Sequence, residues 1–343
     1  MGLFSVLVMY GLSAFYSCLV FTFLVVKSLF NPSKPFWYRK KRDKAPECLQ
    51  DPALGTHHYA KLKGIQLHYV EKGDHSKPLM LFIHGFPEFW YSWRHQIKEF
   101  SKDYWVVAYD MRGYGDSEKP ESVSSYSMDL LVDDVKQLVE YFGKQKITLV
   151  AHDWGGMVAW HFLLKHPEKV EKYIIMDTGF PKGFFSSLKQ FFKSWYIFFF
   201  QMPYLPEMFA SSFDLENFTK VFIDDGSVET GGITEEDIEA YKFTFQNKGG
   251  FTAPINYYRA SMRKRTTSEP QPKRAEPRFD LPVGLFLFAE NDRYLEGESL
   301  LKTAKSWIPN LKTQIVSGGN HFVQQSVPTQ LNHVMREFLK SSS

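Results

Sequence analysis

The sequence predicts an α/β fold: a doubly wound, mostly parallel sheet with an inserted helical cap, preceded by an N-terminal transmembrane helix. Short apolar runs alternate with helical stretches in two parts of the chain, which is the pattern of buried parallel strands. An aromatic-rich region separates these two parts, and the chain begins with one long apolar run. The length of 343 residues favours one core with a sizeable insertion over two large domains.

The N-terminal apolar run carries no charge from Gly2 to Val26. About 20 apolar residues are enough to cross a bilayer, whereas a cleaved signal peptide has a shorter run, a basic start and a small-residue cleavage site. A buried core helix is the alternative, but it fits poorly with an unbroken run at the start of the chain. We therefore predict a single uncleaved transmembrane anchor over residues 1–27, followed by a basic linker over residues 28–54. Because Lys and Arg follow the anchor and none precedes it, the positive-inside rule places the next domain in the cytosol.

The first part of the predicted core covers residues 55–180. It opens with an antiparallel pair of strands over residues 59–73 and continues with four apolar runs, "LMLFIHG", "WVVAYD", "ITLVAHD" and "YIIMDTG". Residues 127–143 lie between two of these runs and have helical periodicity, with Gly143 as a stop signal. Strands that alternate with helices predict a doubly wound sheet, in which ligands bind at the carboxyl ends of the strands.

The alternation stops over residues 181–277, which we expect to form a mostly helical cap. The segment from Phe184 to Phe209 is dense in aromatic residues at helical spacing, and packing of cap on core explains most of them. The charged, proline-rich stretch from Met262 to Asp280 is expected to be a loop. The second part of the core, residues 278–343, supplies two more strands, "GLFLFAE" and "TQIVSGG".

The composition argues against several classes of protein. The formal net charge of +3 is too small to indicate a nucleic-acid partner. Cys18 and Cys48 are the two cysteines and both precede the predicted catalytic domain, so we expect neither a disulfide framework nor a cysteine-rich zinc site. The residues indicate no metal, no organic cofactor and no obligate protein partner.

Four short motifs lie at the ends of predicted strands. The segment "LVAHDWGGMVAW" reads as strand, turn and helix, and it carries Asp153 where the nucleophile elbow of α/β hydrolases usually carries serine in G-x-S-x-G. "HGFPE" follows an earlier strand, "FAENDRYL" brings Asp292 past a late strand, and "SGGNHF" brings His321 past the last one. Nucleophile, acid and histidine thus follow the chain order of the α/β-hydrolase triad. Asp177 in "IIMDTGF" also ends a strand and is the alternative acid.

The motifs "HGFPEFWYSWR", "DMRGYGDSEKP" and "HDWGG" together resemble those of the α/β-hydrolase-fold epoxide hydrolases, particularly the animal members with an N-terminal membrane anchor. The resemblance covers residues 55–338 and the anchor. It implies an α/β-hydrolase fold, hydrolysis of an epoxide to a vicinal diol without a cofactor, and a place in the endoplasmic reticulum (microsomal) membrane. The anchor and the Phe-rich cap favour a small lipophilic epoxide, such as an epoxy fatty acid, as the substrate.

An aspartate nucleophile suits this reaction, because an epoxide has no carbonyl group for a serine to attack and an ordinary aspartate is already ionised at neutral pH. Attack by Asp153 would give a covalent ester. His321, oriented by Asp292, would then activate the water that hydrolyses this ester. Backbone N–H groups of Phe86 and Trp154 would stabilise the oxyanion that forms in the second step.

The resemblance also implies two cap tyrosines that donate hydrogen bonds to the epoxide oxygen. "INYYRAS" maps one of these roles onto Tyr258, with Tyr257 as the alternative, and "WYIFFFQMP" maps the other onto Tyr196. His84 and His152 flank the motifs, and we expect them to support the oxyanion loop rather than to transfer protons.

Two other functions stay open at this point. A haloalkane-type dehalogenase uses the same aspartate nucleophile, although such enzymes often have an Asn where Phe86 stands here. A catalytically silent membrane protein could keep the fold, but the retention of Asp153, Asp292 and His321 argues against it. A serine-type esterase is close to excluded by the aspartate at the elbow.

Overall fold

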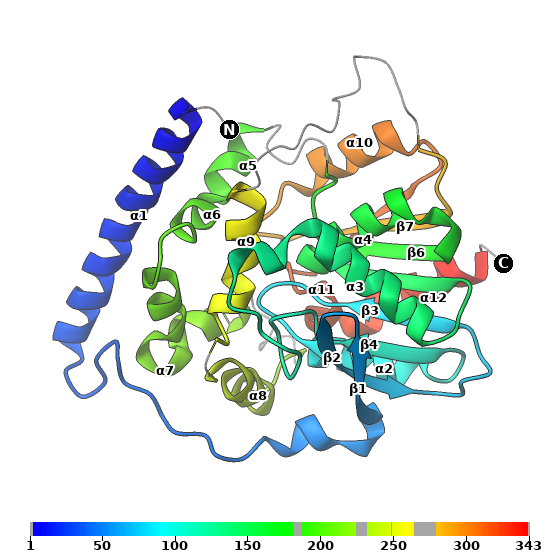
Figure 1. Cartoon of the computed structure of the whole chain (residues 1–343), viewed down its shortest axis with the longest axis horizontal. Helices are drawn as coiled ribbons and strands as arrows, with labels where there is room; N and C mark the ends of the chain where they lie inside the picture. The colour runs from blue at the N-terminus through cyan, green and yellow to red at the C-terminus, as the bar shows by residue number, and fades with distance from the viewer. Residues whose placement is uncertain (1–2, 182–186, 224–231, 248, 264–278, 342–343) are drawn as a thin grey trace.

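The computed structural model describes residues 3–181, 187–223, 232–247, 249–263 and 279–341 of the chain, and it confirms the predicted fold class. A central sheet carries helices on both faces, a group of helices covers one end of the sheet, and a long N-terminal helix runs along the outside of that group (Figure 1). The predicted loop after Met262 falls mostly outside the described residues.

The central sheet has eight strands in the order β1-β2-β4-β3-β5-β6-β7-β8. β1 pairs antiparallel with β2, and β2 pairs antiparallel with β4, whereas all other neighbours are parallel. The three strands β3, β4 and β5 are buried at every position, which is why they read in the sequence as continuous apolar runs. The strand bounds are Thr56–Leu62 (β1), Ile65–Lys72 (β2), Leu79–Ile83 (β3), Trp105–Tyr109 (β4), Ile147–His152 (β5), Val170–Met176 (β6), Val283–Ala289 (β7) and Lys312–Val316 (β8).

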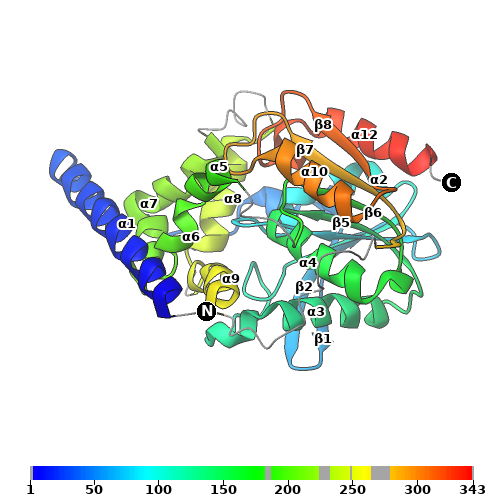
Figure 2. The same cartoon turned by 90° about the horizontal axis from the view of Figure 1, so that it is seen from above.

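Helices of the core cover both faces of the sheet. Figures 1 and 2 show α3, α4 and α10 on one face and α2 and α12 on the other. The short helix α11 contacts both α2 and α12. The bounds are Arg94–Phe100 (α2), Met128–Tyr141 (α3), Asp153–Lys165 (α4), Gly297–Trp307 (α10), Val323–Ser326 (α11) and Pro328–Ser341 (α12).

The helices between β6 and β7 form the layer that we call the cap. They lie at the end of the sheet to which the carboxyl ends of the parallel strands point, so the cap covers the edge where the four motifs meet (Figure 1). The bounds of the described cap helices are Leu188–Lys193 (α5), Trp195–Phe199 (α6), Leu205–Ile223 (α7), Glu235–Phe245 (α8) and Thr252–Arg263 (α9).

Helix α7 is interrupted at Ser212–Leu215, where the backbone leaves helical geometry. The linker that precedes the core binds at this interruption. The N–H of Phe213 donates to the carbonyl of Phe36 at 3.3 Å, and the N–H of Asp214 donates to the carbonyl of Tyr38 at 2.9 Å. The break in α7 therefore keeps its backbone donors satisfied, and the linker is fixed to the outside of the cap.

Arg42 of the same linker joins two cap helices. Its guanidinium binds the Asp214 carboxylate of α7 with two hydrogen bonds, at 2.7 and 2.8 Å, and the Glu239 carboxylate of α8 at 2.8 Å. The Arg42 side chain is nearly buried in this contact. A bidentate charged contact of this kind fixes geometry more strongly than a solvent-exposed ion pair does.

The N-terminal helix α1 spans Leu3–Phe30, and its stretch Val6–Phe30 is long and apolar enough to cross a membrane. It is not separate from the rest of the molecule, because it contacts α6 and α7 of the cap. Both views show α1 at the edge of the molecule with cap helices on one side only (Figures 1 and 2).

Candidate active site

The centre of the site is the tight turn between β5 and α4. Asp153 is the first residue of α4 and adopts φ 47°, in the left-handed region that residues other than glycine rarely occupy. The turn is close to neighbouring backbone: a Cβ at Gly155 would lie 2.4 Å from the carbonyl oxygen of Ile83, and a Cβ at Gly85 would lie 2.6 Å from the Cβ of Asp153. Glycine is therefore required at both positions for the strand ends to approach the nucleophile turn.

The Asp153 carboxyl group has a different partner on each side. Its Oδ1 accepts a hydrogen bond from the N–H of Phe86 at 2.7 Å, and the N–H of Trp154 also hydrogen-bonds the carboxyl group. Its Oδ2 lies 3.7 Å from Nε2 of His321, too far for a hydrogen bond. Burial raises the pKa of Asp153 above its ordinary value, although the charges of His321 and His152 and the two backbone donors act against the rise. The carboxylate is thus poorly solvated and turned toward an imidazole nitrogen.

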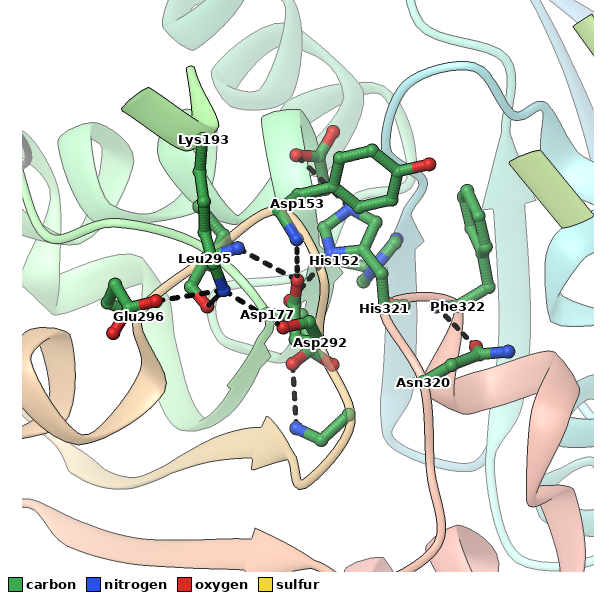
Figure 3. Close-up of polar contacts among 12 residues, drawn as sticks. His152, Asp153, Asp177, Lys193, Asp292, Leu295, Glu296, Asn320, His321 and Phe322 are labelled. Carbon is green, nitrogen blue, oxygen red and sulfur yellow. Dashed lines mark hydrogen bonds and ion pairs between the residues drawn. The ribbon is translucent and has the colours of Figure 1, made fainter. Parts of the chain in front are cut away.

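His321 is held by Asp292 from the other side. Its Nδ1 lies 2.8 Å from Oδ2 of Asp292 (Figure 3). The second oxygen of Asp292 accepts hydrogen bonds from the N–H groups of Tyr294 and Leu295, at 2.7 and 2.9 Å. Burial alone would raise the pKa of Asp292, but the His321 charge and these donors lower it, so Asp292 is ionised. The structure thus brings together three of the predicted site residues, Asp153, Asp292 and His321.

Asp177, the alternative acid, lies in the same cluster but faces another partner. Its Oδ1 accepts a hydrogen bond from the N–H of Ala289 at 2.7 Å. Burial and the negative charge of Asp292 raise the pKa of Asp177 well above its ordinary value, against the opposing effects of His321, His152 and the Ala289 N–H. The geometry favours Asp292 as the histidine partner.

The charge on His321 depends on these carboxylates. Burial acts to lower the pKa of His321, but the charge and hydrogen bond of Asp292, and then the charge of Asp153, raise it to about 10. The imidazole is therefore protonated at neutral pH while both carboxylates are ionised. If Asp153 loses its charge, one of these interactions disappears and the pKa of His321 falls. Covalent modification of Asp153 would in this way make His321 a better base.

A cavity of about 420 Å³ lies between this cluster and the cap. Asp153, His321, Tyr196 and Tyr258 all line it. Its wall is mostly aromatic and includes Phe86, Phe199, Phe200, Phe209, Phe218 and Phe251. A cavity of this size and lining suits a lipophilic molecule with one or two polar atoms.

The two predicted tyrosines lie side by side in the cavity wall. The ring centroids of Tyr196 and Tyr258 are 5.9 Å apart, and both side chains are largely buried. Burial raises the pKa of each hydroxyl well above its ordinary value, and the negative charge of Asp153 acts in the same direction. Both hydroxyls are therefore protonated at neutral pH and can donate hydrogen bonds. Tyr257, the alternative to Tyr258, points elsewhere: its hydroxyl donates to the carbonyl of Arg112 at 2.7 Å.

Residues of the two tyrosine motifs also tie their helices together. Gln201 Nε2 donates to the carbonyl of Ile197 at 3.0 Å and to that of Tyr258 at 3.2 Å, which links the end of α6 to α9. Arg259 Nε donates to the carbonyl of Phe200, at 3.0 Å, and its guanidinium pairs with Glu207 at 2.7 Å. These contacts explain why an arginine directly follows Tyr258: it holds the two tyrosine-bearing helices at one spacing.

Sequence reasoning missed a buried network beneath Asp153. Glu88 is fully buried and accepts hydrogen bonds from the N–H of Gly85 at 2.9 Å, from His152 Nδ1 at 2.8 Å, and from Gln324 and Gln325, both at 2.8 Å. Burial opposes charge on both partners, yet their attraction raises the pKa of His152 and lowers that of Glu88, so they form an ion pair. The only signal in the sequence was the charged residue that ends "HGFPE".

The two predicted supporting histidines lie as expected beside the loops of the site. His152 uses its Nε2 to bind the carbonyl of His321 at 2.7 Å, so it positions the backbone of the predicted catalytic histidine. His84 Nδ1 lies 2.8 Å from the carbonyl of Gly85, and its Nε2 accepts from the N–H of Met111 at 3.1 Å. Neither ring lines the cavity, so both act through backbone geometry.

Tyr294 was also missed by sequence reasoning. Its ring lies 5.0 Å from that of His321 and 6.2 Å from that of Tyr196, measured between centroids, and it lines the cavity. On the cap side, Lys193 of α5 donates to the carbonyls of Asp292 and Leu295, at 3.3 and 3.0 Å (Figure 3). The loop that carries Asp292 is thus fixed to the cap as well as to the core.

Comparison with known proteins agrees with this geometry. Residues 78–225 match the family model described as alpha/beta hydrolase fold. Epoxide hydrolase 4 of Mus musculus is 37% identical over 323 residues, which cover 89% of this chain and 85% of that protein. Epoxide hydrolase 1 of Caenorhabditis elegans is 38% identical over 309 residues, which cover 88% of this chain and 74% of that protein.

Among solved structures, the epoxide hydrolase from Bacillus megaterium in complex with an inhibitor superimposes with a TM-score of 0.74. It is 32% identical in sequence, and the match covers 82% of this chain and all of that one. The relatives and the solved structure share the fold that carries the Asp153, Asp292 and His321 cluster. The chain therefore belongs to the epoxide hydrolase family of α/β-hydrolase-fold enzymes.

Proposed function

We propose that this epoxide hydrolase converts lipophilic epoxides to vicinal diols through a covalent ester on Asp153. The observation that carries the proposal is the two-sided environment of the Asp153 carboxyl group. One oxygen is held by backbone N–H groups, and the other faces the His321 imidazole across a gap of 3.7 Å. This arrangement suits a carboxylate that the epoxide first alkylates to an ester, which water then hydrolyses.

In the first step, a carboxylate oxygen of Asp153 attacks an epoxide carbon and the ring C–O bond breaks. The ring oxygen gains negative charge as it leaves, and Tyr196 and Tyr258 supply the hydrogen bonds and the proton that it needs. Both tyrosines are buried and protonated, which suits general acid catalysis in an apolar site. A partly desolvated carboxylate is also the more reactive nucleophile.

Once the ester has removed the charge of Asp153, His321 gives up its proton and the tyrosine that protonated the ring oxygen regains one, so the imidazole is neutral. In the second step, His321 takes a proton from a water molecule, and the resulting hydroxide attacks Cγ of Asp153. The negative charge then forms on the carboxyl oxygen, where the N–H groups of Phe86 and Trp154 donate to it. Removal of one oxyanion donor in other enzymes costs about 3 kcal/mol. Collapse of this intermediate releases the diol, and Asp153 keeps one oxygen atom from water. Asp292 stabilises the imidazolium that this proton transfer forms.

The substrate class follows from the cavity and from α1. The aromatic wall favours epoxides with long or bulky apolar substituents, of which epoxy fatty acids are one example. The apolar helix α1 can attach the enzyme to a membrane, in which such molecules accumulate. We place this membrane in the endoplasmic reticulum with the catalytic domain on the cytosolic side, because a run of basic residues from Lys34 to Lys44 directly follows α1.

Oxygen-isotope labelling tests the ester mechanism. We expect a single turnover in H₂¹⁸O, with enzyme in excess over an aryl epoxide, to give a diol without heavy oxygen and to leave one heavy oxygen in the peptide that contains Asp153. The reason is that the new diol oxygen comes from the carboxylate, and water refills the carboxylate. Mass spectrometry of the diol and of the peptides measures both.

Peptides that contain Asp177 and Asp292 serve as internal controls and should stay unlabelled. Heavy oxygen in the diol after one turnover, together with an unlabelled Asp153 peptide, would show direct attack of water on the epoxide. That result would overturn the ester mechanism while leaving the family assignment in place.

Replacement of the two cavity tyrosines by phenylalanine tests their role in the first step. We expect Tyr196→Phe and Tyr258→Phe each to slow formation of the ester, and the double variant to slow it by about 10²-fold or more. The double variant should be slower than either single variant, because in a single variant the remaining hydroxyl partly replaces the missing one. Pre-steady-state quenched-flow measurements of protein-bound epoxide give this rate directly.

Tyr257→Phe is the matched control, because it makes the same change at the neighbouring residue. The Tyr257 hydroxyl binds the Arg112 carbonyl and not the cavity, so we expect a loss of about 1 kcal/mol in stability and an unchanged rate of ester formation. A double variant of Tyr196 and Tyr258 that reacts at the wild-type rate would contradict the assignment.

A further inference from the structure

One face of α1 is buried against the cap over most of the length of the helix. The buried positions recur every three or four residues, which is the spacing of one helical face. They are Met9, Ser13, Ser17, Val20 and Leu24, none of which is more than 8% exposed. From Met9 to Lys27 this docked face is about 27 Å long, at about 1.5 Å per residue.

Specific contacts along this face fix α1 to α6 and α7. The buried Ser13 hydroxyl lies 2.7 Å from the carbonyl of Phe198 and 2.7 Å from that of Met9 in its own helix, so its one hydrogen is shared between the two carbonyls. The Tyr16 ring packs on Trp195 of α6, with centroids 5.5 Å apart. Polar contacts of this kind define both the register and the rotation of the helix, which apolar contacts alone would not do.

The end of the docked face is fixed by charge. Lys27 Nζ lies 3.0 Å from the Glu216 carboxylate of α7 and 4.1 Å from the centre of the Phe213 ring. One turn earlier, the Phe23 ring packs against Phe209 of α7, with centroids 6.4 Å apart. The contact with the cap thus extends from the first third of α1 to its last turn.

The opposite face of α1 is apolar and exposed. Figures 1 and 2 show no part of the molecule on this side of the helix. Large apolar side chains on it are between 43% and 74% exposed: Val8, Phe15, Leu19, Val26 and Leu29. Directly after the helix come the exposed Trp37 and the exposed basic residues Lys34, Arg39, Lys40 and Lys41. The aromatic and basic residues that follow the helix suit the interface of a membrane with anionic headgroups.

Docking on the cap and spanning a bilayer would both use the same residues of α1. Spanning needs about 20 residues in a hydrocarbon layer about 30 Å thick, and residues 9–27 already lie against the cap. A bilayer around these residues would place α6, α7 and the charged groups of Glu216 and Lys220 at hydrocarbon depth, which is strongly disfavoured. A helix that lies on the membrane keeps its cap contacts and still buries its exposed face.

We propose that α1 docks lengthwise on the cap and lies in the surface of one lipid leaflet instead of crossing the bilayer. This proposal rests on the membrane attachment inferred above, and it revises the transmembrane arrangement expected from the sequence. It also places the cavity next to the lipid, because Trp195 and Phe209 contact α1 and line the cavity as well. A lipophilic epoxide would then reach the cavity from the leaflet without crossing water.

Topology distinguishes the two arrangements. The full-length protein carries one epitope before Met1 and another after Ser343, and sealed microsomes containing it are treated with protease. A helix on the membrane surface leaves both epitopes on the same side, so we expect both to be cleaved without detergent. Protection of the N-terminal epitope alone would show that α1 crosses the bilayer and would overturn the proposal.

Cross-linking in the same microsomes tests the docking. The native Cys18 and Cys48, which are free thiols, are first replaced by serine. We then expect Phe23→Cys with Phe209→Cys to be joined by a short bis-methanethiosulfonate cross-linker, which fills the space that the two contacting rings occupy in the native protein. Thr22→Cys with Phe209→Cys is the matched control, since Thr22 is the adjacent residue and is exposed away from the cap.

The expected result is a cross-link in the Phe23 pair and at least tenfold less in the Thr22 pair. No cross-link in the Phe23 pair, or equal cross-linking in both pairs, would overturn docking. Neither experiment measures turnover. Their outcome is therefore independent of whether the proposed ester mechanism is correct.

Discussion

The His321→Gln variant is expected to accept one molecule of epoxide per active site and then to stop. In the proposed mechanism His321 acts as a base only in the second step, so the ester on Asp153 should form and persist. General base catalysis contributes about 10²- to 10⁴-fold to a rate, and we expect steady-state turnover to fall by that factor. Intact-protein mass spectrometry should show one adduct with the mass of the epoxide, and peptide mapping should place it on Asp153.

The conditions of this experiment follow from the electrostatics of the site. The positive charge of His321 acts to lower the pKa of Asp153, so its removal lets that pKa rise further. Ester formation in the variant should therefore weaken at a higher pH than in the wild type as the solution is made acidic. Incubation above neutral pH keeps the nucleophile ionised.

His333→Gln provides a matched control, because His333 is an exposed histidine on α12, remote from the cavity lining. It should turn over at the wild-type rate and accumulate no adduct. Wild-type turnover in His321→Gln would contradict the role of His321, and an adduct at another residue would contradict the role of Asp153.

The Asp153→Asn variant should carry out neither ester formation nor ester hydrolysis. Its loss of turnover should therefore be larger than that of any other single substitution proposed for this site. The amide is nearly the same size and can still accept the Phe86 N–H, but it is uncharged and a poor nucleophile. We expect kcat to fall on the order of 10⁴-fold or more, with no adduct detected.

Folding stability should move in the opposite direction to activity. Because burial raises the pKa of Asp153, its ionised form destabilises the folded protein at neutral pH relative to the unfolded chain. A neutral asparagine removes this cost, and asparagine tolerates the left-handed conformation at φ 47°. The melting temperature of Asp153→Asn should therefore equal or exceed that of the wild type.

Differential scanning fluorimetry at neutral pH measures this melting temperature, with Asp133→Asn as the control. Asp133 is exposed on α3, so the same chemical change there should leave both stability and turnover nearly unchanged. A strongly destabilised Asp153→Asn protein would mean that its inactivity reports misfolding and not loss of the nucleophile. Substantial remaining turnover in a stable variant would refute the aspartyl ester.

Much of this architecture could be predicted from local pattern alone. The parallel strands are buried along their length, so each appears in the sequence as an uninterrupted apolar run. Parallel strands also place their carboxyl ends at one edge of the sheet, so residues that follow different strands must meet there. This is why the sequence predicts that Asp153, Asp292 and His321 meet, although only the contact between His321 Nδ1 and Asp292 decides between Asp292 and Asp177.

Contacts between distant segments could not be predicted in this way. Glu88 binds His152, which is 64 positions away, and Gln324, which is 236 positions away, and no periodicity links such residues. The charge-free run at the N-terminus is equally ambiguous, because apolar composition shows that a helix avoids water but not what covers each face. The two serines at positions 13 and 17 become informative only once Phe198 is seen opposite the first of them.

The linker between α1 and the core has a consequence for how the diol leaves. Arg42 binds carboxylates of α7 and α8 on the outside of the cap, and the carbonyls of Phe36 and Tyr38 accept hydrogen bonds from the interruption in α7. With the linker bound across α7 and α8, these helices move as one piece, and such a movement would break the contacts of the cap with the core: Arg94 with Asp237 at 3.2 Å, and the Tyr257 hydroxyl with the Arg112 carbonyl at 2.7 Å. We therefore expect the product to leave through rotation of individual side chains in the cavity wall, and not through a hinge movement of the cap.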